Sequence, residues 1–168
     1  MMLLNLYYEL LEHPYKDSSS SIGEHWSRIK LEILDDEKLL KTAFDIQWDL
    51  TVFLEWFLEN EKTLLYEDIP TNINGTSIAK GVYDFYEKLD PDTIDEALIN
   101  QVYDYRTRHE IWFALRGAKN VDNIFIGLLD SKITISFCND INEWSYDVEV
   151  ASFFKKVHLA FKEISSSI

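Results

Sequence analysis

The sequence predicts an α+β fold, in which an antiparallel sheet packs against about four helices. Two observations support this class. Apolar residues recur with the helical period of about 3.6 from residue 36 to about residue 115, and with the strand period of two in residues 124–150. Strands and helices are thus segregated, without the alternation that indicates βαβ units. With 168 residues, 46% of them hydrophobic, the chain can bury one sizeable core, so we expect a single domain over residues 1–168.

The N-terminal part is expected to supply two strands of the sheet. Residues 1–14 are compatible with a strand or a helix, and a strand is favoured because the segment RIKLEI follows as a pairing partner. In that segment Ile29, Leu31 and Ile33 alternate with charged residues, as in a half-buried strand. The intervening Ser18–Ser21 is expected to be a surface loop.

Three helices are expected next. The first runs from Asp36 to about Tyr66, where a separate short turn at residues 37–44 could precede it. Its apolar side consists of Ile46, Leu50, Phe53, Leu54, Phe57 and Leu58. The second covers residues 77–89. The third follows Asp90-Pro91-Asp92, which would supply an N-cap, a proline at the first helical position and acid in the first turn, and it runs to about Leu115 with Gly117 as its stop.

The C-terminal part is expected to form a three-stranded meander and a last helix. IFIGLL-DS-KITISF predicts a β-hairpin with a tight turn at Asp130-Ser131, and WSYDVEV (residues 144–150) predicts the third strand. A helix over residues 151–164 would bury one apolar stripe, consisting of Phe153, Val157, Ala160, Phe161 and Ile164.

The cationic residues of VYDYRTRHEIWFALRG (102–117) could hold a phosphate, supply a general base or neutralise the chain's own carboxylates. On a helix, His109 lies on the apolar side with Val102 and Tyr105, which predicts a hydrogen-bonded core histidine. Asp104 precedes Arg108 by four residues, and Arg106 precedes Glu110 by four, so each arginine would have a carboxylate partner on the helix itself. Arg116 suits the last helical turn. We therefore expect this cluster to be structural.

Motifs for catalysis, cofactors and metals are missing from the sequence. It has five glycines without a G-x-G-x-x-G or P-loop pattern, and its four histidines form no i, i+4 pair. The single Cys138 excludes a disulfide framework and favours a reducing compartment. We expect no catalytic residue, no metal and no cofactor. The alternative is a metal-dependent or acid/base hydrolase with a carboxylate site that the sequence does not locate.

Acidic residues point instead to a binding surface. On the expected first helix, four acids line the side away from the apolar stripe, with Trp48 and Trp56 among them. Either a second element covers these tryptophans, or they anchor a partner within an acidic rim. A second acidic region surrounds Asp90. The predicted partner-binding residues are Asp45, Trp48, Asp49, Glu55, Trp56, Glu59, Asp84, Glu87, Asp92 and Asp95.

The net charge of −14, from 30 acidic and 16 basic residues, restricts the partners. Such a field repels nucleic acid and anionic lipid and attracts basic proteins, at rates that fall with salt. The N-terminal residues lack the basic region and cleavage site of a signal peptide, and Glu9 and Glu12 interrupt their apolar run. We expect a cytoplasmic protein with no direct contact to nucleic acid or membrane.

A small, acidic, aromatic-rich domain of this kind is similar to the immunity proteins of bacterial toxin–immunity systems, including contact-dependent growth inhibition. The segment from Arg106 through Phe137, with R-x-R-H, A-L-R-G-A and a hairpin ending in KITISF, also resembles a pattern in uncharacterised bacterial domains of such systems. The resemblance implies a protein that is not an enzyme and that neutralises a cognate toxin domain, often a basic nuclease, by occluding its active site. It transfers no functional residue to this chain. An acidic adaptor protein is the other alternative.

Overall fold

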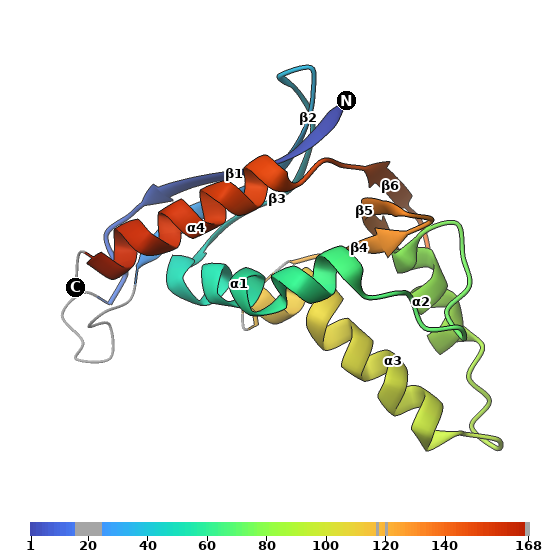
Figure 1. Ribbon diagram of the computed structural model, residues 1–168. Helices are drawn as coiled ribbons and strands as arrows, with labels where there is room; N and C mark the ends of the chain where they lie inside the picture. The colour runs from blue at the N-terminus through green and yellow to red at the C-terminus, as the bar shows by residue number, and fades with distance from the viewer. Residues whose placement is uncertain (16–24, 117, 120, 167–168) are drawn as a thin grey trace. The chain divides into compact units, whose positions relative to one another are not determined.

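The computed structural model describes residues 1–15, 25–116, 118–119 and 121–166, and the chain divides into two compact units (Figure 1). The described residues of 1–59, 114–121 and 149–168 form the first unit, and residues 60–113 and 122–148 form the second. Each unit contains one three-stranded antiparallel sheet together with helices, which confirms the predicted α+β class. The strands belong to two sheets, and not to the single sheet that the sequence predicts. The single domain stays a prediction.

The sheet of the first unit has the order β1-β2-β3, from β1 (Met2–Leu10), β2 (Trp26–Asp35) and β3 (Lys38–Asp49). The alternation in RIKLEI is confirmed, because Ile29, Leu31 and Ile33 are all buried on one face of β2. Leu31 pairs with Leu6 on one side and with Phe44 on the other, so this face carries an apolar row across all three strands.

The prediction of a helix from Asp36 is wrong, because residues 38–49 form β3. Asp36 and Glu37 adopt left-handed φ angles of 46° and 67° between the paired residues Asp35 and Lys38, as in a two-residue hairpin turn. The alternation of Phe44, Ile46 and Trp48 with polar residues is a strand pattern, and the ladder to β2 satisfies the backbone of this segment. The helix α1 (Leu50–Tyr66) begins only after it.

Helix α4 (Ala151–Ser166) and the first turns of α1 complete the core of the first unit. The apolar stripe of α4 is buried as predicted, except that Phe161 is only half-buried. Figure 1 shows α4 lying along β1, and the hydroxyl of Tyr8 on β1 donates to the Glu163 carboxylate of α4 at 3.1 Å. Phe57 of α1 packs against Phe153, with ring centroids 5.0 Å apart. Aromatic packing therefore holds α4 and α1 together.

The sheet of the second unit is the predicted meander β4-β5-β6. Its strands are β4 (Ile124–Leu129), β5 (Lys132–Cys138) and β6 (Glu143–Asp147), so the third strand is shorter than the predicted range 144–150. Asp130 and Ser131 have φ angles of 49° and 66° between the paired Leu129 and Lys132. These left-handed conformations confirm the two-residue turn.

Helices α2 (Ile78–Glu87) and α3 (Glu96–His109) belong to the second unit, and a short 3-10 helix η2 (Ile111–Ala114) follows α3. The predicted start of α3 at Asp90-Pro91-Asp92 is wrong by several residues. The side chain of Asp95 caps α3, accepting hydrogen bonds from the backbone N–H groups of Ala97 and Leu98. Asp90 instead accepts a hydrogen bond from the N–H of Asp92 and closes a turn.

Two predictions fall on positions that cannot be compared with the structure. The predicted stop at Gly117 and the predicted loop Ser18–Ser21 both lie outside the described residues. In the rest of the chain, no helix combines the length and the apolar character that a bilayer crossing needs.

Candidate functional site

The first predicted docking face does not form on a single helix. Asp45, Trp48 and Asp49 lie on β3, whereas Glu55, Trp56 and Glu59 lie on α1. Trp56 is only 8% exposed and packs edge-on against Phe57 at 4.9 Å, so it belongs to the core of the first unit. Trp48 is half-buried beside Trp26. Neighbouring elements therefore cover most of Trp56 and part of Trp48, as the first of the two interpretations of these tryptophans expects.

Two acids of this group already have partners inside the first unit. The Arg28 guanidinium donates two hydrogen bonds to the Asp45 carboxylate, at 2.8 and 2.6 Å, and holds the pKa of Asp45 below its usual value. Asp49 accepts from the backbone N–H of Thr51 at 2.9 Å, at the start of α1. Glu55 and Glu59 remain exposed on the outer side of α1. The membership of these residues in an interface stays a prediction.

The second predicted region is continuous in the second unit. Asp84 and Glu87 lie on α2, Asp92 lies in the loop that follows, and Asp95 caps α3. Glu87, Asp92 and Asp95 are exposed, whereas Asp84 is half-buried and accepts from the Lys80 ammonium at 2.6 Å. The structure thus brings these acids onto one helix–loop–helix segment.

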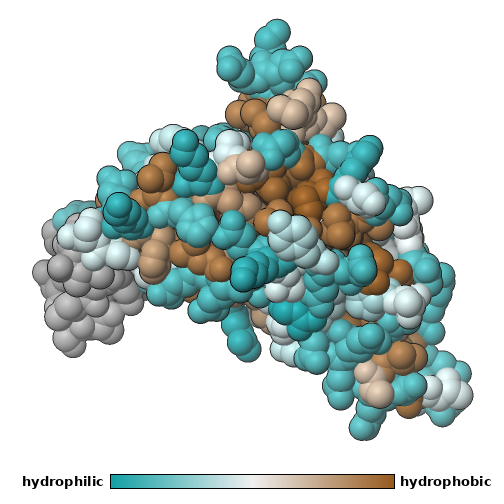
Figure 2. Space-filling model, viewed as in Figure 1, coloured by the Kyte–Doolittle hydropathy of each residue, from teal (hydrophilic) through white to brown (hydrophobic). Residues whose placement is uncertain are grey.

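Apolar side chains stand exposed within this acidic segment, and the sequence analysis missed them. We call residues 90–104 the acidic tip. Its acids are Asp90, Asp92, Asp95, Glu96 and Asp104, and it contains no lysine, arginine or histidine. Ile94 is 51% exposed, Leu98 40% and Tyr103 45%. Figure 1 shows the beginning of α3 at the edge of its unit, away from β4, β5 and β6, and Figure 2 shows hydrophobic surface among hydrophilic residues at that end.

The exposure of Leu98 has a simple geometric cause. Leu98 shares a helical stripe with Val102 and Tyr105, and both of these are fully buried. The stripe is covered only from Val102 onward, because the first turn of α3 extends beyond the core of the second unit. Periodicity in the sequence identifies the stripe, but it does not show where the covering surface ends.

His109 is the fully buried member of a polar network with Glu67 and Arg108 in the second unit. Its ring is 0% exposed and stacks on Tyr105, with ring centroids 4.0 Å apart. Its Nδ1 lies 2.9 Å from the carbonyl oxygen of Ile126, and its Nε2 lies 2.8 Å from Glu67 Oε2. The prediction of a hydrogen-bonded core histidine is confirmed.

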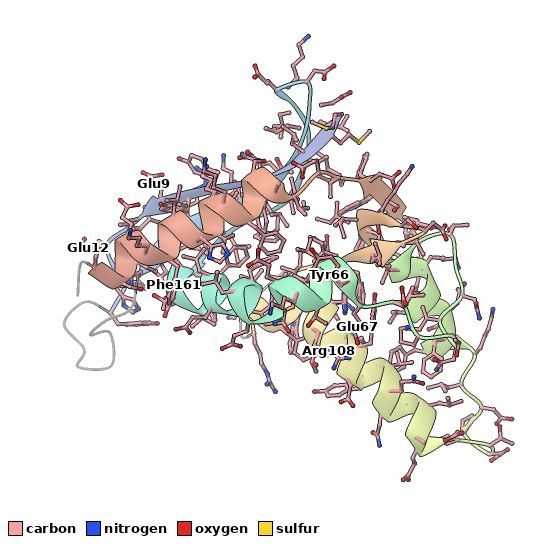
Figure 3. All side chains as sticks on the ribbon, viewed as in Figure 1. Glu9, Glu12, Tyr66, Glu67, Arg108 and Phe161 are labelled. Carbon is pink, nitrogen blue, oxygen red and sulfur yellow. The ribbon has the colours of Figure 1, made fainter. Side chains whose placement is uncertain are left out.

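The two neighbouring arginines differ in their partners. Arg106 pairs with Glu110 four residues later, as predicted, with 2.6 Å between Nε and Oε2, although Glu110 is the C-cap residue that follows α3 and not part of the helix. Asp104 is the predicted partner of Arg108, and this prediction is wrong. The Arg108 guanidinium instead donates to both oxygens of the Glu67 carboxylate, at 3.0 and 2.6 Å. Figure 3 labels Glu67 and Arg108 and shows their side chains close together. Glu67 follows the end of α1, so no spacing on α3 could have indicated this contact.

The network contains the histidine and the carboxylate of a catalytic pair, but a substrate cannot reach the histidine. Burial lowers the pKa of His109, against the opposing hydrogen bonds to Glu67 and Ile126. Burial would raise the pKa of Glu67, but the hydrogen bonds from Arg108 and His109 outweigh it and lower that pKa. A carboxylate-oriented imidazole can act as a general base only if its second nitrogen reaches the substrate. Here both nitrogens face protein oxygens, so the network is structural.

The described metal-ligating side chains and Cys138 do not indicate a further site. Among the described residues, no group of three or more His, Cys, Asp or Glu side chains is arranged to hold a metal ion. Cys138 is buried, and burial raises the pKa of its thiol, which disfavours the reactive thiolate. Comparisons of the chain with protein-family models, with curated proteins and with solved structures find no match.

Proposed function

We propose that this protein is an acidic binding module that neutralises a basic partner protein, in the way that an immunity protein neutralises its toxin. The observation that carries the proposal is the acidic tip. There, exposed Ile94, Leu98 and Tyr103 lie in a segment that has acids but no cation. Scattered exposed apolar residues are ordinary, but three of them within one acidic helix–loop segment combine the two parts of a protein interface.

The two parts would contribute differently to binding. Burying apolar side chains of this size contributes about 1.5–3 kcal/mol each when they go from exposed to covered, and these three are already about half covered. The anchors would therefore supply the affinity. The acids would steer a basic partner to the tip and reject acidic competitors, which raises the association rate more than the affinity.

A nuclease domain is the partner that this charge pattern favours. Nucleases bind phosphates through basic grooves, and carboxylates can occupy the same positions as phosphates and so block the groove. The hydrolase alternative has weaker support. Arginine partners lower the pKa values of Asp45 and Glu67, whereas a general acid needs a raised pKa.

Affinity capture followed by a binding measurement tests this proposal. The protein would be immobilised and exposed to lysate at low salt and at about 0.5 M salt, where the Debye length falls to roughly 4 Å. A captured basic protein would then be purified, and its binding and the inhibition of its activity would be measured. We expect a stoichiometric complex that inhibits the partner and weakens in high salt. A complex that leaves the partner fully active would contradict neutralisation.

A charge-matched pair of variants locates the interface. Asp92→Asn/Glu96→Gln removes two charges from the acidic tip, and Glu55→Gln/Glu59→Gln removes two from the exposed side of α1. Both change the net charge equally, so any difference between them reports position and not total charge. We expect the first variant to bind the partner about tenfold more weakly and the second to bind it nearly as the wild type does. The reverse order would move the interface to α1.

A further inference from the structure

Asn74-Gly75 is the only Asn-Gly pair in the sequence, and it lies in the loop between α1 and α2 of the second unit. Both residues are exposed. Asparagine is a chemically labile residue, and it loses its side-chain amide most readily when glycine follows it. Glycine has no Cβ, so its backbone nitrogen can approach the preceding side chain with little hindrance. The pair is separate from the acidic tip, and the inference drawn from it does not depend on the proposed function.

Packing against α2 explains why glycine occupies position 75. A Cβ at Gly75 would lie 2.6 Å from the backbone nitrogen of Gly81 and 2.9 Å from its Cα, which is closer than such atoms approach one another. The loop therefore lies directly on the first turn of α2, and only a residue without a side chain fits there. This requirement gives Asn74 the neighbour beside which asparagine is most reactive.

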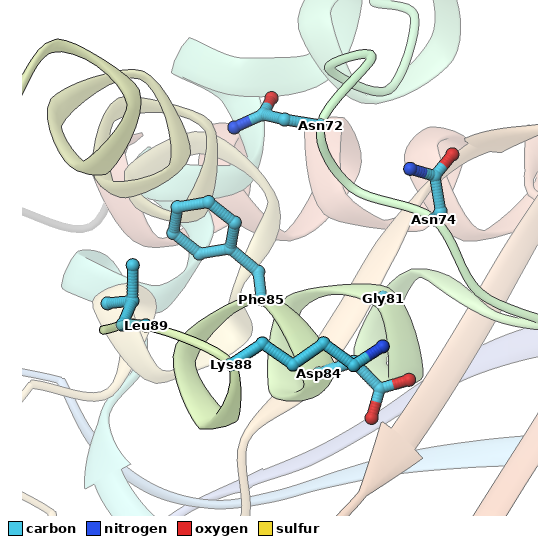
Figure 4. Close-up of a pocket in the computed structure, with 7 residues that line it drawn as sticks. All are labelled: Asn72, Asn74, Gly81, Asp84, Phe85, Lys88 and Leu89. Carbon is cyan, nitrogen blue, oxygen red and sulfur yellow. The ribbon is translucent and has the colours of Figure 1, made fainter. Parts of the chain in front are cut away.

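The atoms that would react are accessible and weakly held. The backbone N–H of Gly75 donates no hydrogen bond to any described residue, so none has to break before this nitrogen turns toward the Asn74 side chain. Nδ2 of Asn74 donates to the carbonyl oxygen of Thr71 at 3.4 Å, which is long for a hydrogen bond. Figure 4 shows the Asn74 side chain projecting from the loop, apart from the other labelled side chains. The fold therefore leaves both the attacking nitrogen and the leaving amide free to move.

We propose that Asn74 is a site of spontaneous deamidation in the folded protein. The backbone nitrogen of Gly75 loses its proton and attacks Cγ of Asn74. The new N–Cγ bond closes a five-membered cyclic imide, the Cγ–Nδ2 bond breaks, and Nδ2 takes up a proton and leaves as ammonia. A water molecule then opens the imide at one of its two carbonyl groups, which gives either aspartate or isoaspartate at position 74.

The two products would affect the second unit differently. Aspartate leaves the main chain unchanged and adds a carboxylate to the lining of a pocket of about 270 Å³ that also contains Lys88 (Figure 4). Lys88 has no carboxylate partner among the described residues, because Asp84 pairs with Lys80 at 2.6 Å. Isoaspartate instead lengthens the main chain by one CH₂ group directly before Gly75, where contact with α2 leaves no space. We therefore expect aspartate to be tolerated and isoaspartate to loosen the start of α2.

Peptide mass spectrometry of the full chain, aged in mildly alkaline buffer, tests the proposal. Trypsin releases residues 63–80 as one peptide, and its fragment ions separate Asn74 from Asn72, whose amide atoms are buried. We expect the mass shift of an amide-to-acid conversion at Asn74, growing with time relative to an unaged sample and growing more slowly in mildly acidic buffer. Asn123 is the internal control, because it is exposed but precedes isoleucine, and it should stay unmodified.

The same chain unfolded in urea shows how fast the pair reacts without the fold. A folded chain that stays unmodified at Asn74 while the unfolded chain reacts would overturn the proposal, because the fold would then withhold the reacting atoms. Conversion of Asn123 or Asn72 as fast as that of Asn74 would also overturn it, since neither glycine nor the loop would then select the site.

Two variants separate the effect of the new charge from that of the longer main chain. Asn74→Asp carries the charge of the aspartate product, and when fresh it should keep the Tm of the fresh wild type. Asn74→Gln keeps the amide but would have to close a larger ring, so its Tm should not change on ageing. The aged wild type should show a lower Tm in proportion to its isoaspartate content. An equal loss of Tm in aged Asn74→Gln, or an unchanged Tm in a sample rich in isoaspartate, would overturn the proposed effect of the modification.

Discussion

Replacing Glu67 tests the polar network around the buried His109 in the second unit. In a Glu67→Leu variant, Nε2 of His109 would lose its partner at 2.8 Å, and the His109 ring is fully buried. A buried polar group that is left unpaired costs about 1–3 kcal/mol. The Arg108 pair is about one-third exposed on both sides, so its loss adds no more than about 1 kcal/mol. We therefore expect the free energy of unfolding to fall by about 2–3 kcal/mol.

Urea unfolding followed by circular dichroism measures this change. With a slope of about 2 kcal/mol per molar urea, the midpoint of the variant should fall by about 1 M or more. Glu59→Leu is the matched control, because it makes the same substitution at an exposed position of α1 and should change stability by no more than about 0.5 kcal/mol. Equal midpoints for the two variants would refute the argument that His109 depends on Glu67.

The same pair of groups predicts a pH dependence. The folded-state pKa values of Glu67 and His109 are both lowered, so the unfolded chain binds more protons than the folded one as the pH falls below the usual histidine and glutamate values. The stabilisation is present at neutral pH and is lost on acidification between about pH 7 and 4. We expect the free energy of unfolding of the wild type, measured by urea unfolding at each pH, to fall continuously over this interval, and a constant or rising value would contradict the assignment.

Two further predictions follow from the fold. Trp56→Ala should destabilise the first unit by about 3–5 kcal/mol, since Trp56 is 8% exposed in an aromatic core, and a thermal melt that retains the wild-type Tm would place this side chain outside the core. Ser131→Gly should raise the free energy of unfolding by about 0.5–1 kcal/mol, because the φ of 66° at this turn position suits glycine, and a lower urea midpoint for the variant would show that the turn does not hold this conformation.

The two acidic regions show how far the binding surface could be predicted. The sequence identifies the acids, and it identifies Trp48 and Trp56 as large apolar groups among them. It does not show that Asp45 and Trp48 lie on the strand β3, whereas Glu55 and Trp56 lie on the helix α1. Exposure depends on which element lies against a residue, and that information is not contained in local spacing.

The sequence by itself determined the α+β class, the meander with its turn at Asp130-Ser131, the buried stripe of α4 and the core position of His109. Each of these depends on periodicity or turn chemistry within about 20 residues, so local patterns are sufficient to predict it. Only the tertiary structure decided three other features. Residues 38–49 form a strand because β2 lies beside them, Arg108 pairs with a carboxylate 41 residues away, and Leu98 is exposed because the core ends before the first turn of α3. Contacts between distant segments set these outcomes, and they override the local preference.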